Sequence, residues 1–271
     1  MQESLLIVEK RDLVCTITLN RPEYRNALSD QLLGQLIEVM DNVNSDPLVR
    51  VVVIRGAGDQ IFSSGYDIRG IQPASKDSAE KITEEREAPQ RENMVRAAAE
   101  SISRHRCPVI AMIYGAAMGA GVELAASCDL RMAADTAKFA VTPAKIGICY
   151  PLEGIWRFVG LMGVAATKEL LFTGAPIDAK RAKEIGLINQ VVEAKQLESV
   201  TYRLASQIAN NAPLSVRGLK KLTSKLVEKP LLSPEDWEES NAVMTSCLHS
   251  YDLQEGIRAF MEKRPPKFEG R

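Results

Sequence analysis

The first half of the chain alternates between short β-branched segments and longer segments with helical spacing. Residues 4–10 and 13–20 are two such β-branched runs around a two-residue turn, which predicts a hairpin. Residues 29–46 carry apolar side chains at helical spacing behind Ser29, a typical N-cap residue. Residues 49–58 then form an apolar run that ends in a glycine turn, which indicates a buried strand. Strands that alternate with helices pair in parallel, so we expect an α/β core.

From about Gly154 the pattern changes to a series of helical segments that continues to the end of the chain. We expect residues 1–200 to form the core and residues 201–271 to form a helical region that packs on a partner subunit. The stretch at 76–91 is rich in charged residues and has little to bury, which is typical of a surface segment.

Charge and cysteine spacing exclude several classes of protein. A net charge of -1 gives no basic surface, so we expect no nucleic acid partner. The five cysteines are scattered without a C-x-x-C pair and there are only two histidines, which argues against a disulfide frame or a metal site. The first residues lack the pattern of a signal peptide, and no apolar run is long enough to span a bilayer. We therefore expect a cytoplasmic protein with no membrane partner.

Residues 114–130, YGAAMGAGVELAASCDL, are almost all small and apolar around a single carboxylate, Glu123. They follow a predicted strand and include the point where the chain turns into a helix. The first amides of a helix have no acceptor within it and carry partial positive charge, so they suit an anion, including one that exists only in a transition state. Alternatively, Gly119 and Gly121 only allow the helix to pack closely. The residues alone leave both interpretations open.

Four further stretches share the order and spacing of one known family. They are NRPEYRNALS at 20–29, FSSGYDI at 62–68, KFAVTPAKIGI at 138–148 and AFMEKRPPKFEGR at 259–271. Together with GAAMGAGVELAASCDLRMAAD at 115–135 they resemble the crotonase (enoyl-CoA hydratase/isomerase) superfamily, from about residue 5 to the C-terminus. The resemblance implies a spiral of ββα turns that binds an acyl-CoA thioester, with coenzyme A entering as part of the substrate rather than as a cofactor. It also implies a homotrimer or homohexamer built by the C-terminal helices.

The same resemblance assigns individual residues. The backbone amides of Tyr66 and Ala120 would hold the thioester oxygen as it becomes an enolate. Many relatives have glycine where this chain has Ala120, and alanine keeps the amide. Arg25 would lie near the phosphates of CoA, and Lys263 would reach the CoA of a neighbouring subunit, although both side chains could also be ordinary solvated charges. The full set implied to lie along CoA is Arg25, Asn26, Ala27, Leu28, Ser64, Asp67, Ile68 and Lys263.

For a hydratase, the resemblance implies two glutamates, because one group activates water while another transfers the α-proton. Glu123 matches the first glutamate. The second falls at Pro143, which cannot act as an acid or base, and the next two residues supply no carboxylate. This departure argues against a two-acid hydratase, although Glu153 could be a displaced second acid.

Tyr150 makes this region similar to the methylmalonyl-CoA decarboxylase branch, where a tyrosine at this place contacts the substrate carboxylate. Decarboxylation suits a site with few acids, because loss of CO2 forms the enolate without a base. One departure is Tyr66, where those relatives carry histidine. Two other functions stay open: a hydratase or isomerase that uses Glu123, and a non-catalytic acyl-CoA-binding protein. For Tyr150 the alternative is a structural role, with its hydroxyl bonded to backbone.

Overall fold

The structure is a computed structural model that describes residues 4–67, 90–228 and 248–264, together with 238, 241, 242, 245, 266 and 267. In these residues the strands form two sheets. The first has the order β1 (Leu6–Arg11), β2 (Val14–Leu19), β3 (Val51–Gly56), β5 (Val109–Ile113), β7 (Leu130–Ala134) and β10 (Gln190–Val192). The second has the order β4 (Ile61–Ser63), β6 (Ala116–Met118), β8 (Lys138–Ala140) and β9 (Ile177–Asp178).

Strand direction follows the prediction from the sequence. β1 and β2 form the expected antiparallel hairpin, in which Arg11 pairs with Val14. β2, β3, β5, β7 and β10 then pair in parallel, so the α/β core is confirmed. The second sheet is parallel except for the pairing of β8 with β9.

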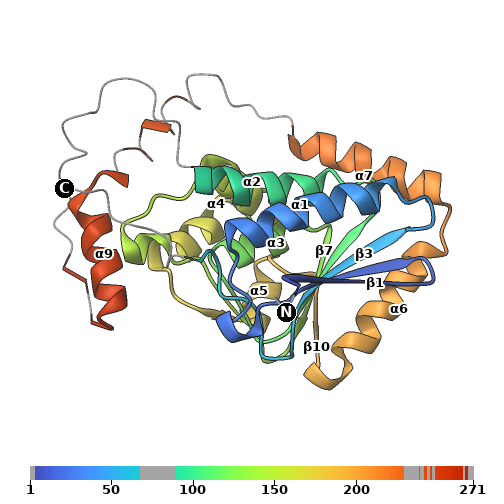
Figure 1. Cartoon of the computed structure of the whole chain (residues 1–271), viewed down its shortest axis with the longest axis horizontal. Coiled ribbons are helices and arrows are strands. Elements are labelled where there is room, and N and C mark those ends of the chain that lie inside the picture. The colour runs from blue at the N-terminus through green and yellow to red at the C-terminus, as the bar shows by residue number, and fades with distance from the viewer. Residues whose placement is uncertain are drawn as a thin grey trace.

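The chain forms this pair of sheets by repeating one unit three times. Each repeat places a strand in the large sheet, places the next strand in the small sheet, and continues into a helix (Figure 1). The repeats are β3–β4–α2 (Gln90–Ser103), β5–β6–α3 (Ala120–Ser127) and β7–β8–α4 (Leu152–Thr173), the last with the short 3-10 helix η4 (Pro143–Ile146) before α4. The expected spiral of ββα turns is therefore confirmed.

The inner strands of the large sheet are buried on both faces, whereas the edge strand β1 is mostly exposed. Val52 and Ile54 of β3 pack on the side of α1 (Asp30–Ser45), α2 and α3, whereas Val51 and Val53 pack against α6 (Leu197–Ala209) on the other side. This explains why β3 is an unbroken apolar run rather than an alternating one. At the start of α1 the Ser29 hydroxyl accepts a hydrogen bond from the Leu32 amide at 3.3 Å, which confirms the predicted N-cap.

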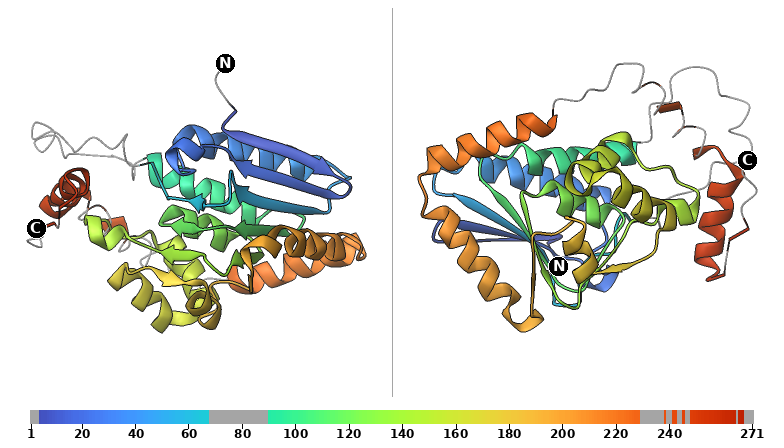
Figure 2. Two further views of the ribbon diagram at one scale, coloured as in Figure 1. Left: turned by 90° about the horizontal axis from the view of Figure 1, so that it is seen from below. Right: turned by 180° about the vertical axis from the view of Figure 1, so that it is seen from behind.

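The boundary expected after residue 200 falls inside α6, whose apolar side belongs to the core. α7 (Pro213–Glu228) is also fixed to the core, because Lys220 Nζ donates to Asp129 Oδ2 at 2.7 Å and to the Cys107 carbonyl at 3.1 Å. α9 (Tyr251–Met261) lies apart from α6 and α7 and packs against η4 (Figure 2). Within the described ranges, every helix falls short of the length and apolar character needed to cross a bilayer.

His105 follows α2 and is buried rather than a simple loop residue. Its Nδ1 lies 3.2 Å from the Cys107 amide, and its Nε2 is buried without a hydrogen-bond partner among the described residues. Burial, together with the positive charges of Lys220, Arg106 and Arg217, lowers the pKa of His105 to about 4, although a hydrogen bond with the Cys107 backbone opposes the shift. The folded protein therefore holds this imidazole neutral.

Acidification from pH 7 to about 4 should cost roughly 3 kcal/mol of stability through His105 alone. The folded pKa is about 4 and the ordinary value is 6.5, so between these values the unfolded chain binds the extra proton and stability falls as the pH falls. Urea unfolding at both pH values measures the loss. His105→Asn, whose amide oxygen can accept from the Cys107 amide, should lose correspondingly less; an equal loss in both proteins would contradict the assignment.

Candidate active site

The two segments predicted to supply oxyanion amides lie against each other. Gly65 has φ +95°, and a Cβ placed on it would lie 2.7 Å from the Met118 carbonyl oxygen and 3.6 Å from the Ala120 nitrogen. Only glycine can therefore occupy position 65 without forcing the segments apart. The fold brings Tyr66 and Ala120 to the same place, although 54 residues separate them in the sequence.

Backbone pairing sets the direction of Tyr66. The Leu28 amide donates to the Gly65 carbonyl at 2.8 Å, and the Asp67 amide donates to the Leu28 carbonyl at 3.0 Å. In a parallel pairing of this kind the central residue directs its own amide away from the partner segment. The Tyr66 hydroxyl donates to Asp30 Oδ1 at 2.6 Å, which fixes the ring at the start of α1.

Ala120 is the first residue of α3, after the left-handed Gly119. The Gly119 amide donates to the Ala140 carbonyl at 2.8 Å, which anchors the turn on β8. The Ala120 amide has no acceptor within the helix and lies at its positive end. Gly121 has a different task, because a Cβ there would lie 2.9 Å from the Ser63 Cβ and carbonyl oxygen. Gly119 therefore makes the turn and Gly121 permits close packing, while anion binding by the Ala120 amide stays a prediction.

Glu123 lies one turn further along α3 with 4% of its surface exposed. The Tyr150 hydroxyl donates to its Oε2 at 2.6 Å, and Arg157 Nη1 donates to its Oε1 at 3.2 Å. Burial raises the pKa of Glu123, while Tyr150 and Arg157 oppose that rise. Both carboxylate oxygens therefore have a protein donor.

Tyr150 is buried, and its hydroxyl is bonded to the Glu123 carboxylate rather than to backbone, so the purely backbone-bonded alternative is wrong. Burial and the charge of Glu123 raise the pKa of Tyr150 well above its ordinary value, so this hydroxyl keeps its proton. The ring is 5.6 Å from the ring of Phe158, and Gly154 leaves room for it, since a Cβ there would lie 2.4 Å from Tyr150 Cε1. Contact with a substrate carboxylate stays a prediction.

The alternative second acid, Glu153, is engaged elsewhere. Its Oε1 lies 2.5 Å from Arg96 Nη1 of α2, and Arg96 Nε also donates to Glu100 at 3.0 Å. Position 143, where the resemblance puts the second glutamate, is the first residue of η4, and η4 carries no carboxylate. Of the acids in α4, Glu153 is the nearest in sequence to position 143, and it is bound in an ion pair with Arg96.

The segment expected along CoA is held mainly by its own polar groups. Asn26 is fully buried, and its Nδ2 donates to the Ala57 and Ile61 carbonyls at 3.1 and 3.0 Å. Ala27 and Leu28 are buried too. Because these three side chains belong to the interior, only their backbone remains for a CoA contact. That contact stays a prediction.

The other expected CoA residues differ in exposure. Arg25 is exposed with φ +53°, and its carbonyl accepts from the Ser64 amide at 3.0 Å. Asp67 pairs with Arg21 at 3.1 Å, so its carboxylate helps to fix this loop. Lys263 is exposed just after α9, and its role towards a neighbouring subunit stays a prediction. Ile68 and most of the predicted surface segment at 76–91 lie outside the described residues.

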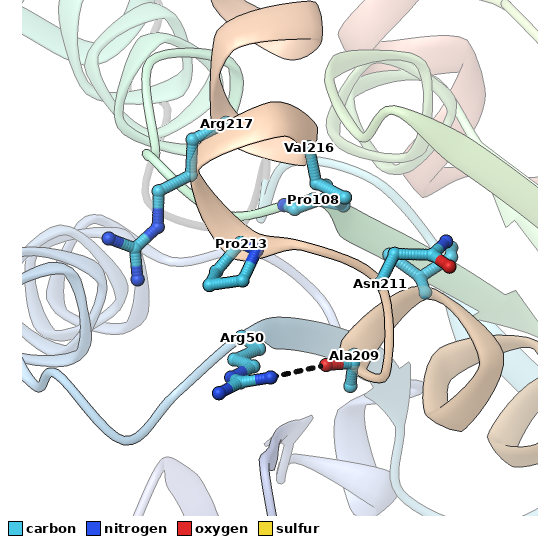
Figure 3. A pocket seen from close by; sticks show the side chains of 8 residues that line it. Arg50, Pro108, Ala209, Asn211, Pro213, Val216 and Arg217 are labelled. Atoms are coloured by element: carbon cyan, nitrogen blue, oxygen red, sulfur yellow. Dashed lines mark hydrogen bonds between the residues drawn. The ribbon is translucent and has the colours of Figure 1, made fainter.

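Sequence reasoning missed Arg157 and Arg21. A buried glutamate needs partners, so Glu123 signals that a cation or hydroxyl must lie nearby, but the sequence does not say which of 34 lysines and arginines it is. The link between α3 and α4 depends on how the two helices pack. A separate small hollow near Arg50, Ala209 and Arg217, where Arg50 Nη1 donates to the Ala209 carbonyl, lies between α6 and α7 and contains none of the predicted site residues (Figure 3).

Comparison with known proteins agrees with this geometry. The family model described as enoyl-CoA hydratase/isomerase matches residues 9–271. Methylmalonyl-CoA decarboxylase of Escherichia coli K12 is 32% identical over 258 residues, 95% of each chain, and carnitinyl-CoA dehydratase of Citrobacter koseri is 35% identical over 275 residues, 100% of each. A solved structure of methylmalonyl-CoA decarboxylase in complex with 2-nitronate-propionyl-CoA is 31% identical, with a TM-score of 0.88 over 99% of both chains.

Proposed function

The chain belongs to the enoyl-CoA hydratase/isomerase family of acyl-CoA enzymes, and from this premise we propose that it decarboxylates a malonyl-type CoA thioester. The observation that carries the proposal is the missing second acid: η4 begins with Pro143 and offers no carboxylate to activate water. The similarity to methylmalonyl-CoA decarboxylase supports the same choice.

The proposed reaction uses the amides of Tyr66 and Ala120 as the oxyanion hole. The thioester oxygen accepts hydrogen bonds from both, and the bond from the α-carbon to the carboxylate breaks. Its electron pair forms the enolate, CO2 leaves, and a proton from water or a weak acid then completes the product. Preorganised donors of this kind matter because the loss of one typically costs about 3 kcal/mol of transition-state stabilisation.

Glu123 does not act as a base in this scheme. Its two oxygens accept from Tyr150 and Arg157, and no proton has to be removed before CO2 leaves. We propose that Tyr150, held by Glu123, borders the substrate carboxylate. The neutral hydroxyl adds no negative charge that would repel that group, and it donates to the substrate carboxylate once its single proton turns away from Glu123 Oε2.

Mass spectrometry of the purified protein with a panel of CoA thioesters tests the proposal. The panel contains methylmalonyl-, ethylmalonyl-, glutaconyl-, crotonyl- and carnitinyl-CoA. Loss of CO2 from a malonyl-type member is the expected result. Gain of water on crotonyl-CoA or loss of water from carnitinyl-CoA, with the malonyl-type members unchanged, would overturn it.

That second outcome corresponds to a second candidate function, a hydratase or dehydratase that uses Glu123. The similarity to carnitinyl-CoA dehydratase favours it, because the identity is 35% over the whole of both chains. Against it, Glu153 would have to leave its ion pair with Arg96 to serve as the second acid. Decarboxylation needs no such rearrangement.

Replacing Arg25 with asparagine should raise KM for the CoA thioester roughly threefold to tenfold and leave kcat unchanged, because an exposed charge near the phosphates contributes to substrate and transition state alike. Asparagine tolerates the left-handed backbone at this position. Steady-state kinetics at low and high salt measure the effect, which should shrink as salt rises. Arg203→Ala, at an exposed position on α6, is the matched control. An unchanged KM would refute the contact.

We also propose a homotrimer or homohexamer. α7 exposes Leu214, Leu219 and Leu222, and α9 exposes Phe260 and Met261, so the C-terminal helices present apolar side chains that a partner subunit could cover. Sedimentation at micromolar concentration should give a multiple of three subunits. A strict monomer would contradict this proposal.

A further inference from the structure

A malonyl-type substrate brings a carboxylate into a site that already contains one. Glu123 lies one turn of α3 from the Ala120 amide, so in the proposed reaction it lies close to the acyl group. Two negative charges about 5 Å apart, at the effective dielectric constant of a protein site, repel enough to weaken binding roughly a hundredfold. A decarboxylase with an ionised glutamate at this position therefore needs a positive charge that compensates this repulsion.

Arg157 is placed to do so. It comes from α4, whereas Glu123 comes from α3, and its Nη1 lies 3.2 Å from Glu123 Oε1. The two side chains are 18% and 6% exposed, so solvent screens the pair little. We propose that Arg157 is a specificity-determining residue that cancels the charge of Glu123 and so lets the site accept a substrate carboxylate. This inference rests on the proposed function.

The surrounding charges agree with this role. Glu153 of α4 is paired with Arg96, so it leaves Arg157 to compensate Glu123. Tyr150 adds a neutral donor on the other oxygen of Glu123. The buried carboxylate of Glu123 thus has one cation and one hydroxyl as partners.

If Arg157 instead bound the substrate carboxylate directly, it would slow decarboxylation. The negative charge moves from the departing carboxylate to the thioester oxygen, so a tight ion pair would stabilise the substrate more than the transition state. Arg157 is accordingly a positioning residue that acts through Glu123. The two roles predict different behaviour when Glu123 is also replaced.

Binding of two probes distinguishes them: 2-carboxypropyl-CoA, which carries the carboxylate, and propyl-CoA, which lacks it. Calorimetry at pH 8 would compare the wild type with Arg157→Gln, Arg157→Lys, Glu123→Gln and the double variant Glu123→Gln/Arg157→Gln. Because loss of Arg157 removes an effect that lowers the pKa of Glu123, the alkaline pH keeps that carboxylate ionised in the single variant. Propyl-CoA reports on whether each variant is folded.

Arg157→Gln should bind the charged probe roughly tenfold to a hundredfold more weakly and propyl-CoA nearly normally. Arg157→Lys should recover much of the loss. The double variant should recover it as well, because the uncompensated carboxylate is gone, and Glu123→Gln alone should bind the charged probe more tightly than the wild type.

Three results would overturn the inference. Equal weakening of both probes in Arg157→Gln would make Arg157 a structural residue. A double variant as weak as Arg157→Gln would show direct contact with the ligand. A wild type that discriminates strongly against the charged probe would show that no compensation exists. Since binding needs no turnover, the inference can hold even if the thioester panel shows no CO2 loss, and it can fail while CO2 is lost.

Discussion

Replacing Ala120 with proline should lower kcat for the proposed decarboxylation by roughly a hundredfold or more while α3 still forms. Proline replaces the amide hydrogen that the mechanism uses with a ring carbon, and the first position of a helix is where proline fits best. Ala120 occupies that first position. Gly119 before it has φ +50° and ψ -120°, an extended mirror-image conformation that avoids the α region disfavoured before proline.

Steady-state kinetics with the malonyl-type substrate give the result, and circular dichroism and urea unfolding show whether the fold is kept. Ala120→Gly is the matched control, because it preserves the amide and should keep kcat within a fewfold of the wild type. A proline variant with near-normal kcat would mean that the Ala120 amide is not part of the oxyanion hole.

Tyr150→Phe should lower kcat roughly tenfold to a hundredfold, since it removes one neutral hydrogen-bond donor beside the reacting group. It also leaves Glu123 Oε2 without the hydroxyl that lies 2.6 Å away. The ring keeps its packing against Phe158, so the change is confined to one oxygen atom. The affinity for CoA should stay within about twofold, because the residues expected along CoA lie on other segments.

Rapid-quench kinetics with the malonyl-type thioester separate the chemical step from product release, and fluorescence titration gives the affinity for CoA. Phe158→Leu, which disturbs the packing of the same ring but keeps the hydroxyl, serves as the comparison. If Tyr150→Phe leaves both constants unchanged, Tyr150 is structural. If CoA affinity falls as much as kcat, the site has been distorted rather than deprived of a donor.

Much of the fold could be predicted from local patterns. The hairpin, the Ser29 cap and the buried β3 each show a characteristic residue pattern within a short segment, and all are confirmed. β6 was not expected as a separate strand. Ala116, Ala117 and Met118 have no strand pattern of their own, and they become a strand because β4 and β8 lie on either side. Strand pairing between distant segments cannot be predicted from the residues of one short segment.

The candidate site divides in the same way. The family resemblance assigns Tyr66, Ala120 and Glu123 to one site, and the structure places the segments of Tyr66 and Ala120 in contact. The resemblance did not identify Arg157 as a partner of Glu123, because this contact depends on the packing of α4 against α3. The sequence also does not show that the Asn26 amide joins two loops, because its acceptors, the Ala57 and Ile61 carbonyls, come from a distant part of the chain; its place beside CoA stays a prediction.

The central claim is that CO2 loss, not proton removal by Glu123, forms the enolate. Incubation in D2O tests it directly: methylmalonyl-CoA in one sample and propionyl-CoA alone in a second, followed by mass spectrometry of the thioesters. The account predicts one deuterium in each propionyl-CoA formed by decarboxylation and no exchange into the propionyl-CoA added alone. Exchange into that second sample without any loss of CO2 from the first, abolished in Glu123→Gln, would show that Glu123 removes the α-proton and would contradict this claim.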